Sequence, residues 1–342
     1  MAIRVGIMGF GRIGRNIFRT IYPRDDIEVV AINELADTRA MEYLLRFDSL
    51  KGTFVEPVRV KGEALYGKGK QIPILHHKEP GEIPWRDYRV DVVVEATGRY
   101  RTRGELQKHI DKGANRVILT TPPRDEIDAI CIRGVSDGPI DARHRIISCG
   151  SSTANCTALM VKVLDRAFHV DRGFFTSVHA YTREQSLIDV PSSIDLRLSR
   201  AAVENIVPLA SWTAKAIEHL FPHLEGNFSG GKLNVPVPDV SCVDLVTVHP
   251  RDLKPEEVNE VFRSASNSTH AGLIEFAEEP IVSSDVIGSP ASCTFDSLTT
   301  LVVQGNMVKT LGWYDQGGGL AYRIVEVISE LALQDQAAAV PL

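Results

Sequence analysis

Short apolar runs alternate with amphipathic stretches through the first half of the chain. Residues 15–22 carry apolar side chains at helical spacing, and Leu106, His109 and Ile110 share one face of a second predicted helix. The runs that predict buried strands are residues 3–8, 27–32, 90–95, 115–119 and 145–147. Strands that alternate with helices in this way are typical of a Rossmann-type, doubly wound parallel sheet of the α/β class.

The pattern changes near Ser152, after which strand-like runs dominate. A proline opens the amphipathic stretch at 255–262, which predicts a helix, and residues 214–217 predict part of another. The predicted strands are residues 173–181, 243–248, 298–303 and 307–313. This mixture predicts an α+β domain with a large, mostly antiparallel sheet. The amphipathic run 320–333 is expected to pack back on the first domain.

Composition narrows the classes of function without selecting one. The chain has 342 residues, enough for two medium-sized domains, and its 44% apolar content supports well-formed cores. A net charge of −6 without a basic block argues against nucleic acid as a partner. No apolar run approaches the roughly 18 residues of a membrane span. The five scattered cysteines indicate a reducing cytoplasm, and their spacing predicts no metal site.

A glycine-rich turn joins the first predicted strand to the first predicted helix. Gly9 permits the tight turn, Gly11 lets the backbone approach a pyrophosphate, and Gly14 permits close packing of helix and strand. Glu34 follows Gly14 by twenty positions, at the end of the next strand, where it can bind ribose hydroxyls and repel a 2′-phosphate. The turn therefore predicts a site for NAD rather than NADP.

The two domains are expected to divide the work between them. Residues 1–151, completed by a C-terminal helix at 320–342, are expected to bind NAD, and residues 152–319 to carry the catalytic chemistry. Residues 148–156 connect the two through small side chains between an apolar strand and an apolar helix. A helix N-terminus at this point favours an anion and stabilises a thiolate. The predicted strand that follows carries His179.

At this point the chain resembles the phosphorylating glyceraldehyde-3-phosphate dehydrogenase family over nearly its whole length. The segments that carry the resemblance are residues 9–15, 95–98, 151–156, 178–182, 205–208, 235–241 and 313–315. Residues 32–37 lean towards the erythrose-4-phosphate dehydrogenase branch. The resemblance implies a cytoplasmic homotetramer with one NAD per subunit, and it places residues 182–200 near a neighbouring subunit's cofactor site.

The resemblance also implies roles for individual residues. The implied cofactor contacts are Gly9, Gly11, Arg12, Ile13, Gly14, Glu34, Thr97, Gly98, Thr120 and Gln316. The implied contacts to substrate or phosphate are Ser151, Thr153, Thr182 and Asn234. In this family a cysteine thiolate attacks the aldehyde, a histidine takes a proton as hydride leaves to NAD, and phosphate releases the acyl group. His179 matches that histidine.

Ser152 stands where the family has its nucleophilic cysteine. A hydroxyl ionises far less readily than a thiol, whose ordinary pKa is near 8.5, and a helix N-terminus does not produce an alkoxide at neutral pH. An acyl ester is also a poorer acceptor for phosphate than a thioester. We therefore expect a large loss of the ordinary phosphorylating activity.

Other positions around the same pocket depart from the family as well. Ser211 and Trp212 replace Thr-Gly at the position for inorganic phosphate, and Asn234 replaces the arginine for the substrate phosphate. Arg183 and Arg197 are the candidates for a replacement charge. Gln316 replaces an asparagine that orients the nicotinamide amide. An engineered Ser152 would leave the rest of the pocket intact, so these combined changes favour natural divergence.

Three hypotheses follow from this pocket. The first is an NAD-dependent oxidoreductase that acts on a small aldehyde, phosphorylated or not. The alternative is a catalytically silent NAD-binding or assembly protein of the same fold. A hydrolase that uses Ser152 with His179 as base lacks an evident carboxylate to orient the histidine. Cys149, three residues upstream of Ser152, is a candidate substitute nucleophile, and Cys156 matches the family's second, non-nucleophilic cysteine.

Overall fold

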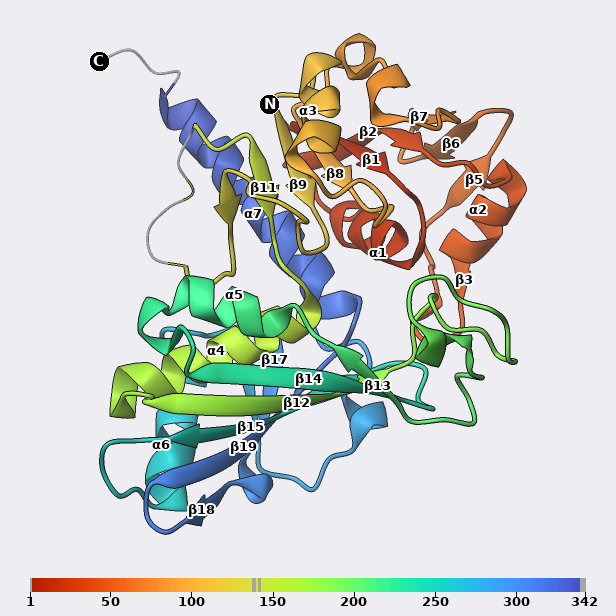
Figure 1. Cartoon of the computed structure of the whole chain (residues 1–342). Helices are drawn as coiled ribbons and strands as arrows, with labels where there is room; N and C mark the ends of the chain where they lie inside the picture. The colour runs from red at the N-terminus through yellow and green to blue at the C-terminus, as the bar shows by residue number, and fades with distance from the viewer. Residues whose placement is uncertain (1, 137–139, 141–142, 339–342) are drawn as a thin grey trace. The chain divides into compact units, whose positions relative to one another are not determined.

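The computed structural model describes residues 2–136, 140 and 143–338. The chain divides into two compact units, each of which has its own sheet (Figure 1). The first unit consists of Met1–Ile132, Asp137–Gly150 and Leu320–Leu342, and the second of Arg133–Ser136 and Ser151–Gly319. Residues 339–342 of the predicted C-terminal helix lie outside the described residues. The expected division of function between residues 1–151 and 152–319 remains a prediction.

The first unit is built on a nine-stranded sheet in the order β10-β11-β9-β8-β1-β2-β7-β6-β5. Its strands are β1 (Ile3–Met8), β2 (Ile27–Asn33), β5 (Val58–Val60), β6 (Ala64–Gly67), β7 (Lys70–Leu75), β8 (Val92–Glu95), β9 (Arg116–Leu119), β10 (Ala129–Ile130) and β11 (Ile146–Ser148). The strands from β10 to β7 pair in parallel, which confirms the predicted doubly wound sheet. Antiparallel β6 and β5 extend one edge, and the short pair β3 (Phe47–Asp48) and β4 (Gly52–Thr53) lies apart.

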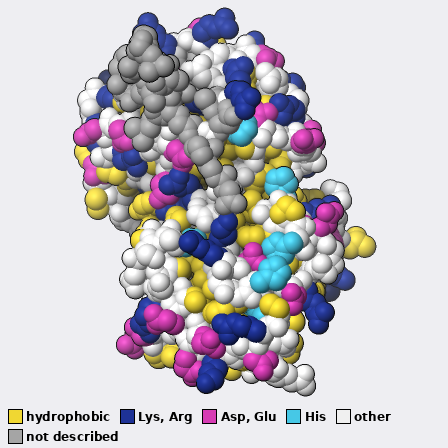
Figure 2. Space-filling model, turned by 90° about the vertical axis from the view of Figure 1, so that its left-hand side faces the viewer, with side chains coloured by type: hydrophobic (Ala, Val, Ile, Leu, Met, Phe, Trp, Pro, Cys, Tyr) yellow, Lys and Arg dark blue, Asp and Glu magenta, His cyan; other side chains and the backbone are white. Residues whose placement is uncertain are grey.

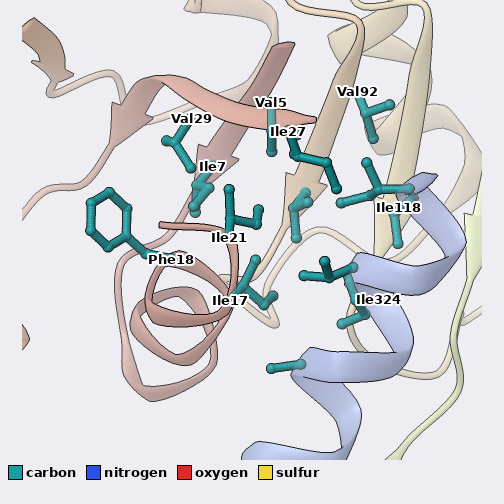
Figure 3. Close-up of a cluster of buried hydrophobic side chains, with 14 of the residues drawn as sticks. Val5, Ile7, Ile17, Phe18, Ile21, Ile27, Val29, Val92, Ile118 and Ile324 are labelled. Carbon is teal, nitrogen blue, oxygen red and sulfur yellow. The ribbon is translucent and has the colours of Figure 1, made fainter. Parts of the chain in front are cut away.

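Helices cover this sheet with apolar side chains. They are α1 (Arg12–Ile21), α2 (Thr38–Arg46), α3 (Arg103–Asp111) and α7 (Gly318–Ala338). Figure 3 shows Ile17 and Ile21 of α1 directed into a cluster with Val5 of β1, and Ile324 of α7 directed into the same cluster. All four side chains are fully or almost fully buried, so α1 and α7 belong to one core although some 300 residues separate them.

The second unit contains an eight-stranded mixed sheet in the order β13-β14-β12-β15-β19-β17-β16, with β18 paired to β19. Its strands are β12 (Arg172–Ala180), β13 (Val207–Ala210), β14 (Phe228–Val235), β15 (Ser241–Val248), β16 (Ile274–Ala277), β17 (Cys293–Asp296), β18 (Leu301–Val303) and β19 (Met307–Tyr314). Most pairs are antiparallel, as predicted, while β12–β14 and β16–β17 are parallel.

One predicted strand is partly wrong. Residues 298–303 are strand only from Leu301 onward, because Ser297–Thr299 forms a 3₁₀ turn. The Asp296 carboxylate accepts a hydrogen bond from the Leu298 N–H at 3.2 Å and stabilises this turn. A local carboxylate–backbone contact of this kind competes with strand pairing, and apolar periodicity alone does not reveal it.

Helices α4 (Ser152–Phe168) and α5 (Thr213–Leu220) lie along one face of this sheet (Figure 1). Helix α4 contacts β15 and β19, and α5 contacts β14. The remaining long helix, α6 (Pro255–Ser266), packs on α4 and β16. Because side chains alternate along a strand, Ser177 and His179 of β12 share one face. Among the described residues, no helix has both the length and the apolar character that crossing a bilayer requires.

The tight approach of α1 to the glycine-rich turn generates a stability prediction. A Cβ on Gly14 would lie 2.2 Å from the Gly9 carbonyl oxygen, whereas a Cβ on Gly11 would meet no described atom within 4 Å. We expect Gly14→Ala to lower the free energy of unfolding by about 1–3 kcal/mol, because the backbone must shift. The matched variant Gly11→Ala should change the free energy of unfolding by only a few tenths of a kcal/mol. Urea denaturation measures both, and equal effects would contradict the prediction.

Candidate functional site

The glycine-rich turn of the first unit has the shape that a dinucleotide requires. Gly9 has a φ of +92°, which glycine adopts readily, and Gly14 lies against the Gly9 carbonyl. Gly11 is the N-cap of α1, and no described side chain caps the helix there. A helix N-terminus that opens onto free space fits the pyrophosphate of NAD. Arg12 and Ile13 form the first turn of this helix.

Glu34 lies next to the same turn, as the sequence predicts for a ribose-binding residue. Its carboxylate accepts hydrogen bonds from the backbone N–H of Phe10 at 2.6 Å and of Leu35 at 2.7 Å. A third bond comes from the Ala36 N–H at 3.1 Å. The structure therefore brings the acidic residue and the glycine-rich turn together. The role of Glu34 in binding the ribose stays a prediction.

A buried polar network supports the two other strand ends predicted to contact the cofactor. The Trp85 indole donates to Nδ1 of His109 at 2.9 Å, so His109 carries its proton on Nε2 and donates to Glu95 at 3.3 Å. Glu95 also accepts from the Thr97 N–H at 2.8 Å and from its hydroxyl at 2.5 Å. The Thr120 hydroxyl donates to the Glu95 carbonyl at 3.1 Å. Thr97 and Thr120 are thus held by one residue of β8.

Gly98 follows Thr97 with a φ of +70°, a left-handed conformation. A side chain there would be strained whatever space surrounds it. The residue therefore lets the chain turn sharply where β8 ends, beside the network around Glu95. The small-residue run 96–98 does not by itself predict the positive φ of Gly98 or the hydrogen-bond network around Glu95.

In the second unit, Ser151 and Ser152 begin helix α4. The Ser151 hydroxyl accepts a hydrogen bond from the Ala154 N–H at 3.2 Å and caps the helix. The Ser152 hydroxyl donates to the main-chain carbonyl of Gln316 at 2.7 Å. Its proton is therefore directed at a carbonyl oxygen, which is not a base.

Gln316 and His179 form the centre of this site. The Gln316 side-chain amide lies 3.1 Å from each of three atoms: the Ala180 carbonyl oxygen, the Ser241 hydroxyl and Nδ1 of His179. His179 Nδ1 also lies 2.7 Å from the Ala180 carbonyl. An amide has two N–H groups, which the carbonyl and the hydroxyl accept, so we assign the imidazole proton to Nδ1 and the lone pair to Nε2.

The hydroxyl of Thr153, predicted to contact phosphate, is used inside the core. It lies 2.6 Å from the Tyr314 hydroxyl, which in turn lies 3.0 Å from the Ser177 hydroxyl. Burial raises the pKa of Tyr314 above its ordinary value, so this phenol stays protonated. The chain of hydroxyls connects the first turn of α4 with β12 and β19. Whether Thr153 also contacts a ligand stays a prediction.

Asn234 lies directly beside His179, because β12 and β14 pair in parallel with these two residues in register. Its side-chain N–H donates to the Gln185 side-chain oxygen at 2.5 Å. Three buried polar atoms here find no hydrogen-bond partner among the described residues: Asn234 Oδ1, Gln185 Nε2 and the Thr182 hydroxyl. Buried groups without partners are uncommon in proteins, and such atoms indicate a place for a ligand or for water.

Two residues of this site are not evident from the sequence. Gln185 lies in the polar stretch 182–200, where nothing distinguishes it from its neighbours. Lys232 lies two residues before Asn234 on β14, so it shares the face that carries His179, and it pairs in register with Ser177. Burial lowers the pKa of Lys232, and the charge of Glu184 partly opposes this. The alternation of side chains along a strand would have placed Lys232 on the same face as Asn234, which lies two positions further along.

The cysteines do not present an accessible thiol. All five are buried, and the exposed fractions of Cys149 and Cys156 are 1% and 0%. Burial and the neighbouring Cys293 raise the pKa of Cys156 well above its usual value, which disfavours its thiolate. The burial of Cys149 argues against its use as a substitute nucleophile.

Two family profiles and close relatives match this chain. The profile described as "Glyceraldehyde 3-phosphate dehydrogenase, NAD binding domain" matches residues 3–103, and "Glyceraldehyde 3-phosphate dehydrogenase, C-terminal domain" matches residues 148–316. The chain is 43% identical over 329 residues to glyceraldehyde-3-phosphate dehydrogenase 2 of Streptomyces avermitilis, which covers 96% of this chain and 98% of that protein.

Similar values hold for enzymes of other bacteria. Identity is 41% over 325 residues with glyceraldehyde-3-phosphate dehydrogenase 1 of Bacillus cereus, covering 95% of this chain and 97% of that protein. Identity is 41% over 333 residues with glyceraldehyde-3-phosphate dehydrogenase of Geobacillus stearothermophilus, covering 97% of this chain and 99% of that protein. The chain therefore belongs to the glyceraldehyde-3-phosphate dehydrogenase family of NAD-binding oxidoreductases.

Proposed function

We propose that the protein oxidises a small aldehyde with NAD, and that Ser152 leaves it with little of the family's phosphorylating activity. One observation carries this proposal: His179 and Ser152 meet around Gln316, yet the Ser152 proton is donated to a carbonyl. The base is therefore in position, whereas the nucleophile is not activated. NAD, when bound, accepts the hydride from the aldehyde carbon.

His179 is the proposed base. Its Nδ1 proton is held by the Ala180 carbonyl, which orients the ring and directs the lone pair on Nε2 away from that carbonyl. General bases of this kind contribute about 10²–10⁴-fold to the rate. In the absence of a thiolate, the group that loses its proton as hydride departs is a hydroxyl of the hydrated aldehyde. The product of that step is the carboxylic acid, and no acyl group on Ser152 is required.

Ser152 is a poor nucleophile for physical reasons. Serine attacks carbonyl groups in proteins when an adjacent base removes its proton. Here the partner of its hydroxyl is the Gln316 carbonyl at 2.7 Å, which cannot accept the proton permanently. The positive end of the α4 dipole favours an anion at this point, but by about 0.3–1 kcal/mol, too little to ionise a hydroxyl at neutral pH.

The substrate side of the site combines neutral amides with one cation. Asn234 and Gln185 offer buried donors and acceptors that suit the hydroxyl groups of a short polyol chain. We assign Lys232 as the charge that contacts an anionic group of the substrate, since it shares the face of His179. The relatives are named for glyceraldehyde-3-phosphate, and we propose a small aldehyde of this kind, phosphorylated or not.

The proposed assembly is a homotetramer in the cytoplasm. Several apolar side chains of residues 182–200 are exposed in the single chain, including Ile188 at 71% and Leu196 at 83%. Exposed apolar side chains that cluster in one segment are typical of surfaces buried by another subunit. This supports the expected contact of the segment with a neighbouring subunit.

Restoring the thiol tests the proposal for Ser152. We expect Ser152→Cys to raise phosphate-dependent NAD reduction with glyceraldehyde-3-phosphate by about two orders of magnitude or more, because a thiol is partly ionised at neutral pH. The control variant Ser151→Cys, with a thiol one residue away, should not raise this activity. Adding His179→Asn to Ser152→Cys should lower the rate about 10²–10⁴-fold.

The same assays decide between the two classes of function. If neither the parent nor Ser152→Cys reduces NAD with glyceraldehyde-3-phosphate, erythrose-4-phosphate or glyceraldehyde, while both bind NAD, then the aldehyde pocket is lost. That result would contradict the oxidoreductase and favour a silent NAD-binding or assembly protein.

The cofactor site has its own test in Gly11. We expect Gly11→Ala to weaken NAD binding about tenfold or more, because its methyl group occupies the space proposed for the pyrophosphate at the start of α1. Calorimetric titration with NAD measures this change. Unchanged affinity in a variant of unchanged stability would place the pyrophosphate elsewhere.

Lys232 is tested by comparing a charged with a neutral substrate. In the Ser152→Cys background, Lys232→Met should lower kcat/KM for glyceraldehyde-3-phosphate about tenfold or more, since a hydrogen bond to a charged group contributes about 1.5–3 kcal/mol. The value for neutral glyceraldehyde should fall much less. Arg172→Met, on the opposite face of β12, is the control.

The stability of the same variant separates function from structure. Burial lowers the folded-state pKa of Lys232, so the folded protein disfavours its charged form and stability rises as pH increases towards the ordinary lysine value. Lys232→Met removes this cost, and its Tm at neutral pH should equal or exceed that of the parent. Equal loss of activity on both substrates would contradict the assigned contact.

A further inference from the structure

Two histidines and an aspartate converge at the C-terminal end of α4. Asp165 and His169 lie one helical turn apart, and His169 is the C-cap of the helix. His223 comes from the 3₁₀ helix η4 (Pro222–Leu224), which follows α5. Asp165 Oδ1 lies 3.4 Å from His169 Nδ1 and 3.1 Å from His223 Nε2. Histidine side chains can be seen close together on the surface in Figure 2.

The spacing of these atoms matches a tetrahedral metal site. Zinc lies about 2.0–2.2 Å from nitrogen and oxygen ligands, so two ligand atoms of a tetrahedron are about 3.3–3.5 Å apart. The distances of 3.4 and 3.1 Å from Asp165 Oδ1 to His169 Nδ1 and His223 Nε2 are close to this value, and all three ligand atoms lie within 4.8 Å of one another. Within the described part of the chain, this is the one group of three such side chains close enough to share an ion.

The backbone holds these side chains in place before any ion is bound. The Val170 N–H donates to Asp165 Oδ1 at 2.9 Å, and the His169 carbonyl accepts from His249 Nδ1 at 2.7 Å. His169 has a φ of +53°, a positive value that is uncommon for a residue other than glycine. Strain of this kind persists where the surroundings enforce it, and it clusters at ligand sites.

The outer surroundings also suit a metal-bound histidine. Asp171 Oδ1 lies 3.8 Å from His169 Nε2, the ring nitrogen that does not face Asp165, which is close but longer than a hydrogen bond. Histidines that bind metals usually donate their second N–H to a carboxylate or carbonyl, which fixes the tautomer. The His169 and His223 rings are stacked, with centroids 5.1 Å apart and planes 27° apart, so each presents one nitrogen to the same carboxylate oxygen.

A hydrogen-bonded cluster without a metal is the simpler alternative. It accounts for two of the three contacts, because Asp165 Oδ1 accepts hydrogen bonds from the Val170 N–H at 2.9 Å and from His223 Nε2 at 3.1 Å. The 3.4 Å separation from His169 is longer than an ordinary N–H···O bond, whose distance is about 2.7–3.2 Å. The hydrogen bonds therefore do not account for the approach of His169 Nδ1 to Asp165, whereas one cation between the three ligand atoms does.

We propose that Asp165, His169 and His223 bind one divalent transition-metal ion, with zinc as the best match. Two imidazole nitrogens together with one carboxylate oxygen suit zinc better than magnesium or calcium, which prefer oxygen ligands alone. Both histidines are substantially exposed, so water completes the tetrahedron. Asp165 lies thirteen residues beyond Ser152, about 20 Å along α4, so the site is separate from the proposed reaction. The bound ion links the end of α4 to η4.

Titration of the full-length chain with Zn²⁺ alone, after removal of metals with EDTA, tests this site. Calorimetry should show one ion per chain for the parent. His223→Asn and His169→Asn should each weaken binding at least about tenfold, whereas His219→Asn, an exposed histidine outside the cluster, should not. Zn²⁺ should raise the Tm of the parent and leave that of His223→Asn unchanged.

Two results would overturn the proposal. One is the absence of stoichiometric Zn²⁺ binding by the parent, which needs no variant to interpret. The other is binding of unchanged affinity in both His223→Asn and His169→Asn, which would place the ion elsewhere. The Tm values of the metal-free variants verify that each is folded, and the two histidine variants report independently of each other.

Discussion

The candidate site of the second unit is organised by one residue, Gln316, whose main chain and side chain connect α4, β12, β15 and the segment before β15. Its carbonyl accepts the Ser152 hydroxyl at the start of α4, and its N–H donates to Asp239 before β15. Its side-chain amide donates to Ala180 of β12 and to Ser241 of β15. These contacts favour the His179 tautomer with its proton on Nδ1. The Ser152 hydroxyl, in turn, donates its proton to the Gln316 carbonyl. The proposed base, His179, is therefore oriented by its neighbours, whereas the Ser152 hydroxyl is engaged in a structural hydrogen bond.

Polar groups are satisfied unevenly across this site. Around Gln316 almost every donor meets an acceptor, but near Asn234 three buried atoms have no partner among the described residues. Each such atom costs about 1–3 kcal/mol unless a ligand or water satisfies it. The half-buried Lys232 adds a charge that burial disfavours. These costs concentrate around Asn234 and Lys232, which we propose as the substrate side of the site.

Helix α4 gives the second unit a rigid axis with different chemistry at each end. Most of its side chains are buried, so the helix cannot rotate or slide without breaking the core. Its N-terminus carries Ser152 and its capping serine, and its C-terminus carries Asp165 and His169. A ligand at either end is therefore held by a framework that does not depend on that ligand.

The sequence alone determined the class of fold and the family, because both rest on local patterns. Alternating strands and helices, the glycine-rich turn and the spacing to Glu34 arise within short stretches of chain, and the structure brings these parts together. The burial of Cys149, the pairing of Asn234 with Gln185 and the place of Lys232 beside Ser177 were decided only by tertiary structure. So was the meeting of His223 with a helix that ends 55 residues earlier. Strand register and helix packing join residues that no local periodicity relates, and these contacts decide the chemistry of each site.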